Sequence, residues 1–273
     1  MRLYGDALNL SLMDFKYFFA VMLFCISYIP EGEANERTCD PSKFIIAVDI
    51  GHTLNSPGAT SARGVTEFDF NHRLATLVVE QLQAHGFINT ITINKKGDIG
   101  SLAERTKQAA DSNANLFLSI HHDSVQPSYL KTWVFNGEKN LYSDIFSGYS
   151  LFVSSKNPKF DQSLRAAVAI GLALRKHGLN PTLHHAENIP GENRPLLNSN
   201  LGIYRFDDLV VLKSAIMPAV LLEAGVIVNR SEEVILAGEE HQQLVAISIV
   251  EAVRHFCNNT DEPYDSNDLN LDR

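Results

Sequence analysis

The chain alternates short apolar runs with longer segments whose apolar residues recur every three to four positions. The short runs predict buried strands, and the longer spacing predicts amphipathic helices. We expect strands at 44–50, 89–94, 115–120, 132–135, 149–153, 209–212 and 219–223. We expect helices at 67–86, 101–110, 163–177 and 240–256. This alternation predicts an α/β fold: a single domain with a twisted, mostly parallel sheet and helices on both faces.

Polar residues mark several boundaries of these elements. Ser101 and Glu104 have the spacing of a capping box, and Gly86 and Gly178 stand where helices end. Residues 180–200 contain three prolines, one glycine and five asparagines, so we expect a surface loop there.

The N-terminal region has a different pattern. Residues 17–30 form an uninterrupted apolar run after Lys16. This run is shorter than the roughly 20 apolar residues of a transmembrane helix but has the length of a signal-peptide core. We therefore expect a signal peptide at 1–34 and export to the periplasm or cell envelope. Met13 offers an alternative start, and an uncleaved anchor remains the other interpretation.

Export changes the interpretation of the cysteines. Removal of the signal leaves Cys39 and Cys257, one at each end of the predicted domain at 40–257. In an oxidising compartment they are candidates for a disulfide, and two free buried thiols are the alternative. Residues 258–273 are rich in Asn and Asp, and we expect a disordered tail.

Composition narrows the class of protein. The 273 residues are 45% hydrophobic and carry a formal net charge of −9. A chain of this length can bury a large core. Its acidic balance argues against a nucleic-acid partner, because such proteins normally present a basic surface.

Candidate metal ligands stand at three predicted strand ends. His52 follows the first strand, His121 the third and Glu223 the last, while Glu67 opens the helix after the first strand. Two imidazoles and one carboxylate are the ligand set of several hydrolytic zinc sites. A second carboxylate could then act as a general base.

Taken singly, each of these residues has a structural explanation. A histidine at a strand end commonly makes hydrogen bonds, and the helix dipole favours Glu67 where it stands. Glu223 is harder to explain in this way, because a carboxylate inside an apolar run is costly unless it is paired or coordinated. The sequence contains no His-Glu-x-x-His motif and no Gly-x-Ser-x-Gly motif, which argues against a zincin-type peptidase and a serine hydrolase.

Four motifs together carry a resemblance to a known family. They are Val48-Asp-Ile-Gly-His52, Glu67, Leu118-Ser-Ile-His121 and Met217-Pro-Ala-Val-Leu-Leu-Glu-Ala-Gly225. They resemble the zinc-dependent N-acetylmuramoyl-L-alanine amidases of the cell-wall-hydrolase type (amidase type 3) over residues 44–256. The resemblance implies one Zn²⁺ per chain bound by His52, Glu67 and His121, with Glu223 as general base. Arg105 and Asn113 also match family positions, and we interpret both as structural.

The sequence departs from the family pattern in three places. Ile50 replaces a usual proline, His122 replaces a usual alanine, and 124–200 is longer than in the simplest members. His122 raises the question of which adjacent histidine binds metal. Neighbouring strand residues point to opposite sides, and the motif favours His121. Some relatives carry an inhibitory helix in this segment, but 129–148 shows no convincing amphipathic pattern.

The resemblance implies hydrolysis of the amide bond between N-acetylmuramic acid and L-alanine in peptidoglycan. A zinc peptidase or deacylase on the same scaffold, or a non-catalytic peptidoglycan-binding module, is the alternative. We expect a monomer, and an activator protein stays open. The pair His184–His185 with nearby Glu187 gives poor evidence for a second metal site, so a loop that borders the cleft or is simply solvated fits better.

Overall fold

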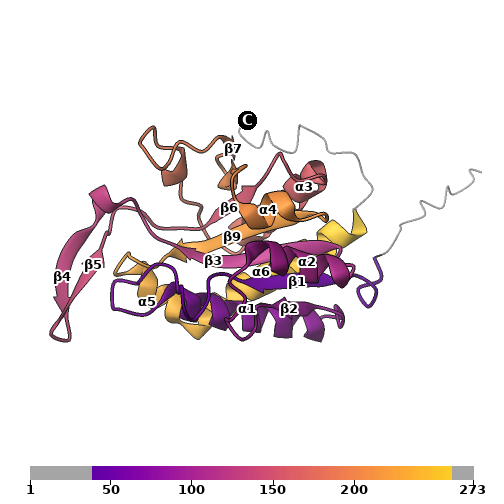
Figure 1. Cartoon of the computed structure of the whole chain (residues 1–273), viewed down its shortest axis with the longest axis horizontal. Helices are drawn as coiled ribbons and strands as arrows, with labels where there is room; N and C mark the ends of the chain where they lie inside the picture. The colour runs from indigo at the N-terminus through magenta and orange to yellow at the C-terminus, as the bar shows by residue number, and fades with distance from the viewer. Residues whose placement is uncertain (1–38, 260–273) are drawn as a thin grey trace, which may run out of the picture. The chain divides into compact units, whose positions relative to one another are not determined.

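The computed structural model describes residues 39–259, so the predicted signal peptide and nearly all of the predicted tail lie outside the described residues. A seven-stranded sheet in the order β2-β1-β3-β9-β6-β8-β7 forms the centre (Figure 1). Its strands are β1 (Ile46–Ile50), β2 (Ile91–Ile93), β3 (Leu116–Asp123), β6 (Ser150–Val153), β7 (Leu196–Asn198), β8 (Ile203–Arg205) and β9 (Ala219–Val226).

The direction of pairing divides the sheet into two parts. Strands β2, β1, β3 and β9 are parallel, and β6 pairs with β9 in the antiparallel direction. Strand β8 is parallel to β6, and β7 is antiparallel to β8. The prediction of a mostly parallel sheet is therefore confirmed. The carboxyl ends of β1, β3 and β9 meet at one edge, where ligands of open α/β sheets bind.

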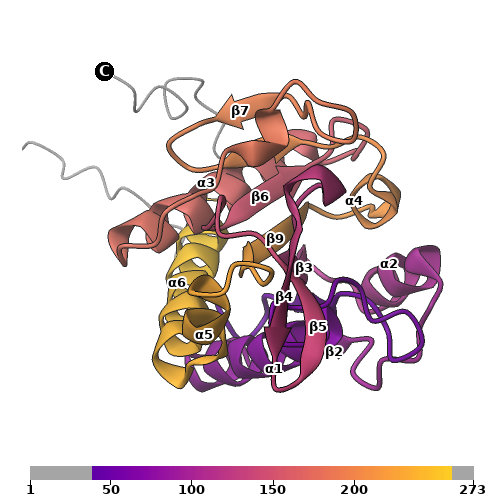
Figure 2. The ribbon, with the colours of Figure 1, turned by 90° about the vertical axis from the view of Figure 1, so that its left-hand side faces the viewer.

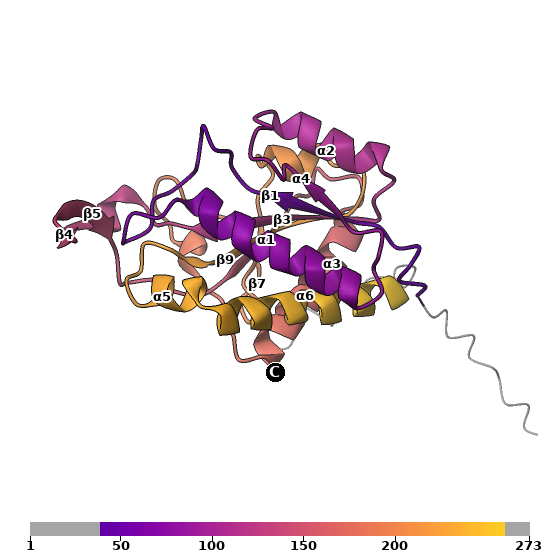
Figure 3. The same cartoon turned by 90° about the horizontal axis from the view of Figure 1, so that it is seen from below.

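Helices cover both faces of this sheet, as expected. The six α-helices are α1 (Glu67–Ala84), α2 (Leu102–Asp111), α3 (Phe160–Lys176), α4 (Val210–Ser214), α5 (Glu232–Ala237) and α6 (Glu239–Asn258). Helices α1, α3 and α6 share one hydrophobic core with Val48 of β1, whereas α2 and α4 pack with Ala47 on the other face. Figure 3 shows α1 and α6 lying along the first of these faces. Within residues 39–259, no helix is long and apolar enough to cross a membrane.

The prediction of a strand at 209–212 was wrong, because these residues enter helix α4. Val211 and Leu212 are buried in the core that α4 shares with α2. A four-residue apolar run fits one buried helical turn as well as it fits a buried strand, so periodicity could not separate the two.

Residues 129–148, where we expected no inhibitory helix, contain a β-hairpin. Strands β4 (Lys131–Phe135) and β5 (Glu138–Tyr142) form a separate two-stranded sheet (Figures 1 and 2). Asn136 and Gly137 both have positive φ angles, 50° and 85°. Two-residue hairpin turns of type I′ need this conformation, and Asn-Gly is the pair that adopts it most readily.

Cys39 and Cys257 form a disulfide, with their Cα atoms 5.4 Å apart. The bond joins the segment just before β1 to the last turn of α6, and the two cysteines pack against the larger hydrophobic core. Of the two alternatives, a bridge and two free thiols, the structure has the bridge.

Candidate active site

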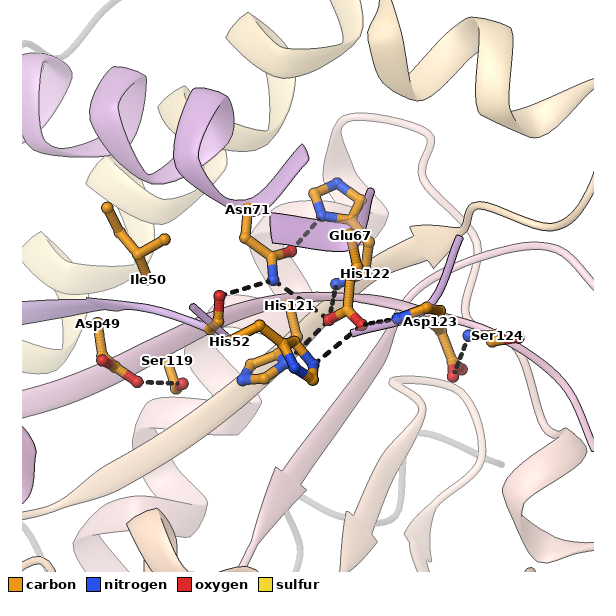
Figure 4. A network of polar contacts seen from close by, with 12 residues as sticks. Asp49, Ile50, His52, Glu67, Asn71, Ser119, His121, His122, Asp123 and Ser124 are labelled. Atoms are coloured by element: carbon orange, nitrogen blue, oxygen red, sulfur yellow. Dashed lines mark hydrogen bonds and ion pairs between the residues drawn. The ribbon is translucent and has the colours of Figure 1, made fainter. Parts of the chain in front are cut away.

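The structure brings His52, Glu67 and His121 together at the carboxyl edge of the sheet (Figure 4). Nε2 of His52 lies 3.0 Å from Oε2 of Glu67, and Nδ1 of His121 lies 3.0 Å from Oε1. One ligand atom from each residue falls within 4.8 Å of the other two. Each carboxylate oxygen of Glu67 therefore faces one imidazole.

The backbone after β1 is shaped to present His52. His52 has a φ of 66°, and buried groups on two sides hold its carbonyl oxygen. Arg105 donates to the carbonyls of Ile50 (2.9 Å) and His52 (2.5 Å), and Asn94 donates to the same two carbonyls at 2.8 and 2.7 Å. Arg105 is thus structural, as predicted, and its role is to fix the turn that carries a candidate ligand.

Glycines allow the candidate ligands to approach the backbone. A Cβ atom on Gly51 would lie 2.5 and 2.6 Å from Cε1 and Cδ2 of His121, and one on Gly58 would lie 2.8 Å from Nε2 of His52. Gly58 also has a φ of 80°, which disfavours other residues. The Gly-His motif therefore has a steric origin: any side chain at Gly51 would occupy the space of the His121 ring.

Glu67 is buried at the first turn of α1, and several donors hold its carboxylate. Asn71 donates to Oε1 at 3.2 Å, and the backbone N–H of Ala59 donates to Oε2 at 3.1 Å. Burial would raise the pKa of this carboxyl, but hydrogen bonds and charge from His121 and His52 outweigh burial and lower the pKa below its usual range. The same carboxylate works against burial at His52, whose pKa is raised.

The two adjacent histidines of β3 have different surroundings. His121 faces Glu67, whereas Nδ1 of His122 lies 2.8 Å from Oδ1 of Asn71 (Figure 4). The ring of His122 packs near that of Phe70. Complete burial lowers the pKa of His122 to about 3, which keeps the imidazole neutral. Only His121 belongs to the cluster of candidate ligands.

Glu223 lies on β9 directly opposite His121 in the parallel register. The residue is half-buried, and its Oε2 is buried with no hydrogen-bond partner among the described residues. Burial, followed by the negative charges of Asp123 and Glu67, raises the pKa of Glu223 well above its usual value. A carboxyl with such a pKa, beside a cleft, is suited to proton transfer.

A cleft of about 590 Å³ opens over these groups. His52, His121 and Glu223 line it, together with the apolar side chains of Phe206 and Leu209. The remaining lining residues relevant to the site are Gln126, His185, Glu192 and Arg194, which come from or contact the segment after α3. The loop at 180–200 therefore borders the cleft, and it is less exposed than we predicted, because His184 and His185 are buried.

Sequence reasoning did not identify two groups near the cleft. Asp49 is fully buried and accepts hydrogen bonds from Ser119 (2.8 Å) and Arg105 (3.4 Å) beneath the turn that carries His52. Asp123 ends β3 and contacts His184 and His185. The run His121-His122-Asp123 placed a third polar residue at that strand end, which was the available signal for Asp123.

The donor set fits a zinc ion. Two imidazole nitrogens and a carboxylate oxygen are borderline ligands of the kind that zinc prefers, and hydrolytic zinc sites use three protein ligands of this type. Hydrogen bonds to Glu67 from Asn71 and Ala59 supply the outer support that such sites need. The mostly parallel sheet therefore carries a candidate metal site of the hydrolytic type at its carboxyl edge.

Comparisons with known proteins identify the family. A model of the N-acetylmuramoyl-L-alanine amidase family (Amidase_3) matches residues 46–255. The chain belongs to this family: it is an N-acetylmuramoyl-L-alanine amidase (EC 3.5.1.28), a hydrolase of cell-wall peptidoglycan.

Individual relatives agree with this assignment. A candidate N-acetylmuramoyl-L-alanine amidase of Buchnera aphidicola subsp. Baizongia pistaciae is 26% identical, over 78% of this chain and 95% of its own length. The fold is similar to the amidase Ami1 of Mycobacterium smegmatis (TM-score 0.61, 19% identity, 79% and 97% of the two chains). It is also similar to the CwlD amidase of Clostridioides difficile, solved in complex with the GerS lipoprotein (TM-score 0.58, 19% identity, 78% and 98%).

Proposed function

We propose that His52, Glu67 and His121 bind one zinc ion and that Glu223 is the general base in cleavage of the bond between N-acetylmuramic acid and L-alanine. The observation that carries the proposal is the meeting of three ligand atoms within 4.8 Å, with His52, His121 and Glu223 lining one cleft. When bound, zinc lowers the pKa of a water molecule and polarises a carbonyl group.

The protein groups have separate tasks in this reaction. Glu223 takes a proton from the attacking water and transfers it to the nitrogen of the leaving L-alanine. Oε2 of Glu223 is buried without a hydrogen-bond partner, which favours the protonated carboxyl that holds the proton between the two transfers. Arg105 and Asn94 hold the turn that positions His52, and Asn71 holds Glu67.

The test is digestion of purified peptidoglycan, with products identified by mass spectrometry. The wild-type chain is expected to release intact stem peptides and leave the glycan strands uncut. Glu223→Gln is expected to lower the rate by about 10²–10⁴-fold, the usual contribution of a general base, while zinc content stays unchanged. Glu138→Gln, a matched change on the exposed end of β5, is expected to retain wild-type activity.

Other products would point to the alternatives. Shortened stem peptides would indicate a zinc peptidase, and loss of acetyl groups would indicate a deacylase. Binding to peptidoglycan without any product would indicate a non-catalytic module. Full activity in Glu223→Gln would refute the assigned base while leaving the family assignment intact.

We also propose that the chain is exported with residues 1–34 as its signal and 40–257 as its catalytic domain. The disulfide between Cys39 and Cys257 supports this, since such bonds persist in oxidising compartments. Mass spectrometry of the mature protein from a cell-envelope fraction would give its first residue. A free Cys39 thiol in that fraction would contradict the proposal.

A further inference from the structure

A second group of ligand-type side chains lies beside the first. Asp123 at the end of β3 meets His184 and His185 of the 3₁₀ helix η2 (His184–Ala186), and we call these three residues the Asp-His-His cluster. Nε2 of His184 lies 3.2 Å from Oδ2 of Asp123, and Nε2 of His185 lies 2.8 Å from the same oxygen. All three side chains are at least 88% buried, with 1%, 11% and 12% exposed for His184, His185 and Asp123.

The outer nitrogen of each ring is held by another group. Nδ1 of His184 lies 2.8 Å from Oγ1 of Thr182, and Nδ1 of His185 lies 2.9 Å from Oε2 of Glu192. Gln126 in turn donates to Glu192 at 2.7 Å. Metal-binding histidines are oriented in this way, because a partner on one nitrogen fixes the tautomer and leaves the lone pair of the other nitrogen for the metal.

Hydrogen bonding alone does not satisfy this cluster. Nε2 of His185 has hydrogen-bond geometry toward Asp123, but the approach of His184 does not, and its buried Nε2 has no hydrogen-bond partner within residues 39–259. A buried polar atom left in this way needs an explanation, such as an ion. A cation among the three residues would give that nitrogen a partner.

The contacts of the cluster resemble those of the first site, except that both imidazoles face one oxygen of Asp123, whereas each oxygen of Glu67 faces one imidazole. In both, two imidazoles approach one carboxylate, at 3.0 and 3.0 Å around Glu67 and at 2.8 and 3.2 Å around Asp123. Aromatic rings pack against the second group: Phe146 stacks on His184 at 4.9 Å, and Phe152 lies edge-on to His185 at 5.0 Å. The second group is the better buried of the two, since His52 is 33% exposed.

We propose that the Asp-His-His cluster is a second metal site, which binds a divalent transition metal ion of the zinc class. Imidazole and carboxylate ligands select such ions over calcium or magnesium, which prefer oxygen ligands alone. His185 lines the same cleft as His121 and Glu223, so the ion lies at the border of the substrate cleft. This inference goes beyond the proposed function, which requires one ion.

The experiment is a zinc titration of the purified full-length chain after removal of metal with a chelator. Bound zinc is measured by mass spectrometry of the metal after gel filtration. The wild type is expected to bind two equivalents, and Asp123→Asn and His184→Gln one each. Glu67→Gln is also expected to bind one, and the double variant Asp123→Asn/Glu67→Gln none. His85→Gln, an exposed histidine at the end of α1, is the matched control and is expected to bind two.

The stoichiometry of the wild type decides the question even if a variant folds poorly. One equivalent in the wild type, lost in Glu67→Gln, would overturn the second site and leave the first intact. Two equivalents in a folded Asp123→Asn chain, verified by circular dichroism, would place the second ion elsewhere and also overturn the proposal. A Co²⁺ titration gives an independent readout, with two distinguishable visible spectra expected for the wild type and one for Asp123→Asn.

Discussion

Replacement of Gly51 by alanine would test whether close packing sets the position of His121. The added Cβ would lie 2.5 Å from Cε1 of His121, whereas ordinary contacts begin at 3.4 Å. The ring must therefore move by about 0.9 Å, the difference between those two values. Metal-binding groups must stay within about 0.5 Å of their productive positions, so this displacement exceeds what a site tolerates.

The expected result is a large effect on zinc affinity and a moderate one on folding. Changes that only disturb the support of a metal ligand typically weaken binding 10–100-fold, and we expect at least that loss for Gly51→Ala. Overpacking should lower the free energy of unfolding by about 1–3 kcal/mol. Zinc affinity is measured by competition with a chromophoric chelator in the Asp123→Asn background, so that only the cluster of His52, Glu67 and His121 is titrated.

Gly100→Ala is the matched control. A Cβ at Gly100 would meet no atom within 4 Å, so this variant is expected to keep both zinc affinity and stability. Gly51→Ala with wild-type affinity would refute the steric explanation of the Gly-His motif. Equal losses in both variants would also refute it, since they would arise from glycine replacement in general.

Two further predictions concern buried groups beneath the site. Arg105→Met leaves the Asp49 carboxylate buried without its cationic partner, so urea denaturation should show a loss of about 3–5 kcal/mol in the free energy of unfolding. The control Arg254→Met, at an exposed arginine, should lose less than about 1 kcal/mol. A loss below about 1 kcal/mol for Arg105→Met would contradict its structural role. Burial lowers the pKa of His122 to about 3, so the folded chain excludes a proton that the unfolded chain binds below pH 6.5. The contribution of His122 to the free energy of unfolding is therefore complete above pH 6.5 and is lost as the pH falls. Between pH 6.5 and 5, with chelator present, the free energy of unfolding of the wild type should fall by up to about 1.4 kcal/mol per pH unit more than that of His122→Ala. If the free energies of the two proteins fell in parallel with pH, the pKa of His122 would not be lowered by folding.

The parts of the site that follow strand ends could be predicted from the sequence. A buried run that stops at a polar residue fixes where that residue emerges, so His52, His121 and Glu223 could be assigned to one edge before any contact was known. Glu67 was predictable for a different reason, because apolar residues at helical spacing follow it and locate the start of α1. Strands β1, β3 and β9 are parallel neighbours, so their carboxyl ends bring these residues together.

The Asp-His-His cluster could not be predicted in the same way. His184 lies 61 residues after Asp123, in a segment whose prolines and asparagines indicated only a loop. Local pattern carries no information on what such a loop packs against, and the rings that cover the two histidines, Phe146 and Phe152, come from other parts of the fold. Likewise, helix α4 (Val210–Ser214) packs its apolar residues with those of α2. A short window of sequence does not show that contact.

The disulfide between Cys39 and Cys257 can form only late in the synthesis of the chain. The two cysteines are 218 residues apart, and no third cysteine lies between them. Because a chain is made from its N-terminus, Cys39 is synthesised before every strand and before α1 to α5. No cysteine between Cys39 and α6 can form a wrong disulfide with it. The bridge can close only when the last helix has arrived, so the oxidised form marks chains whose domain has been made to its end.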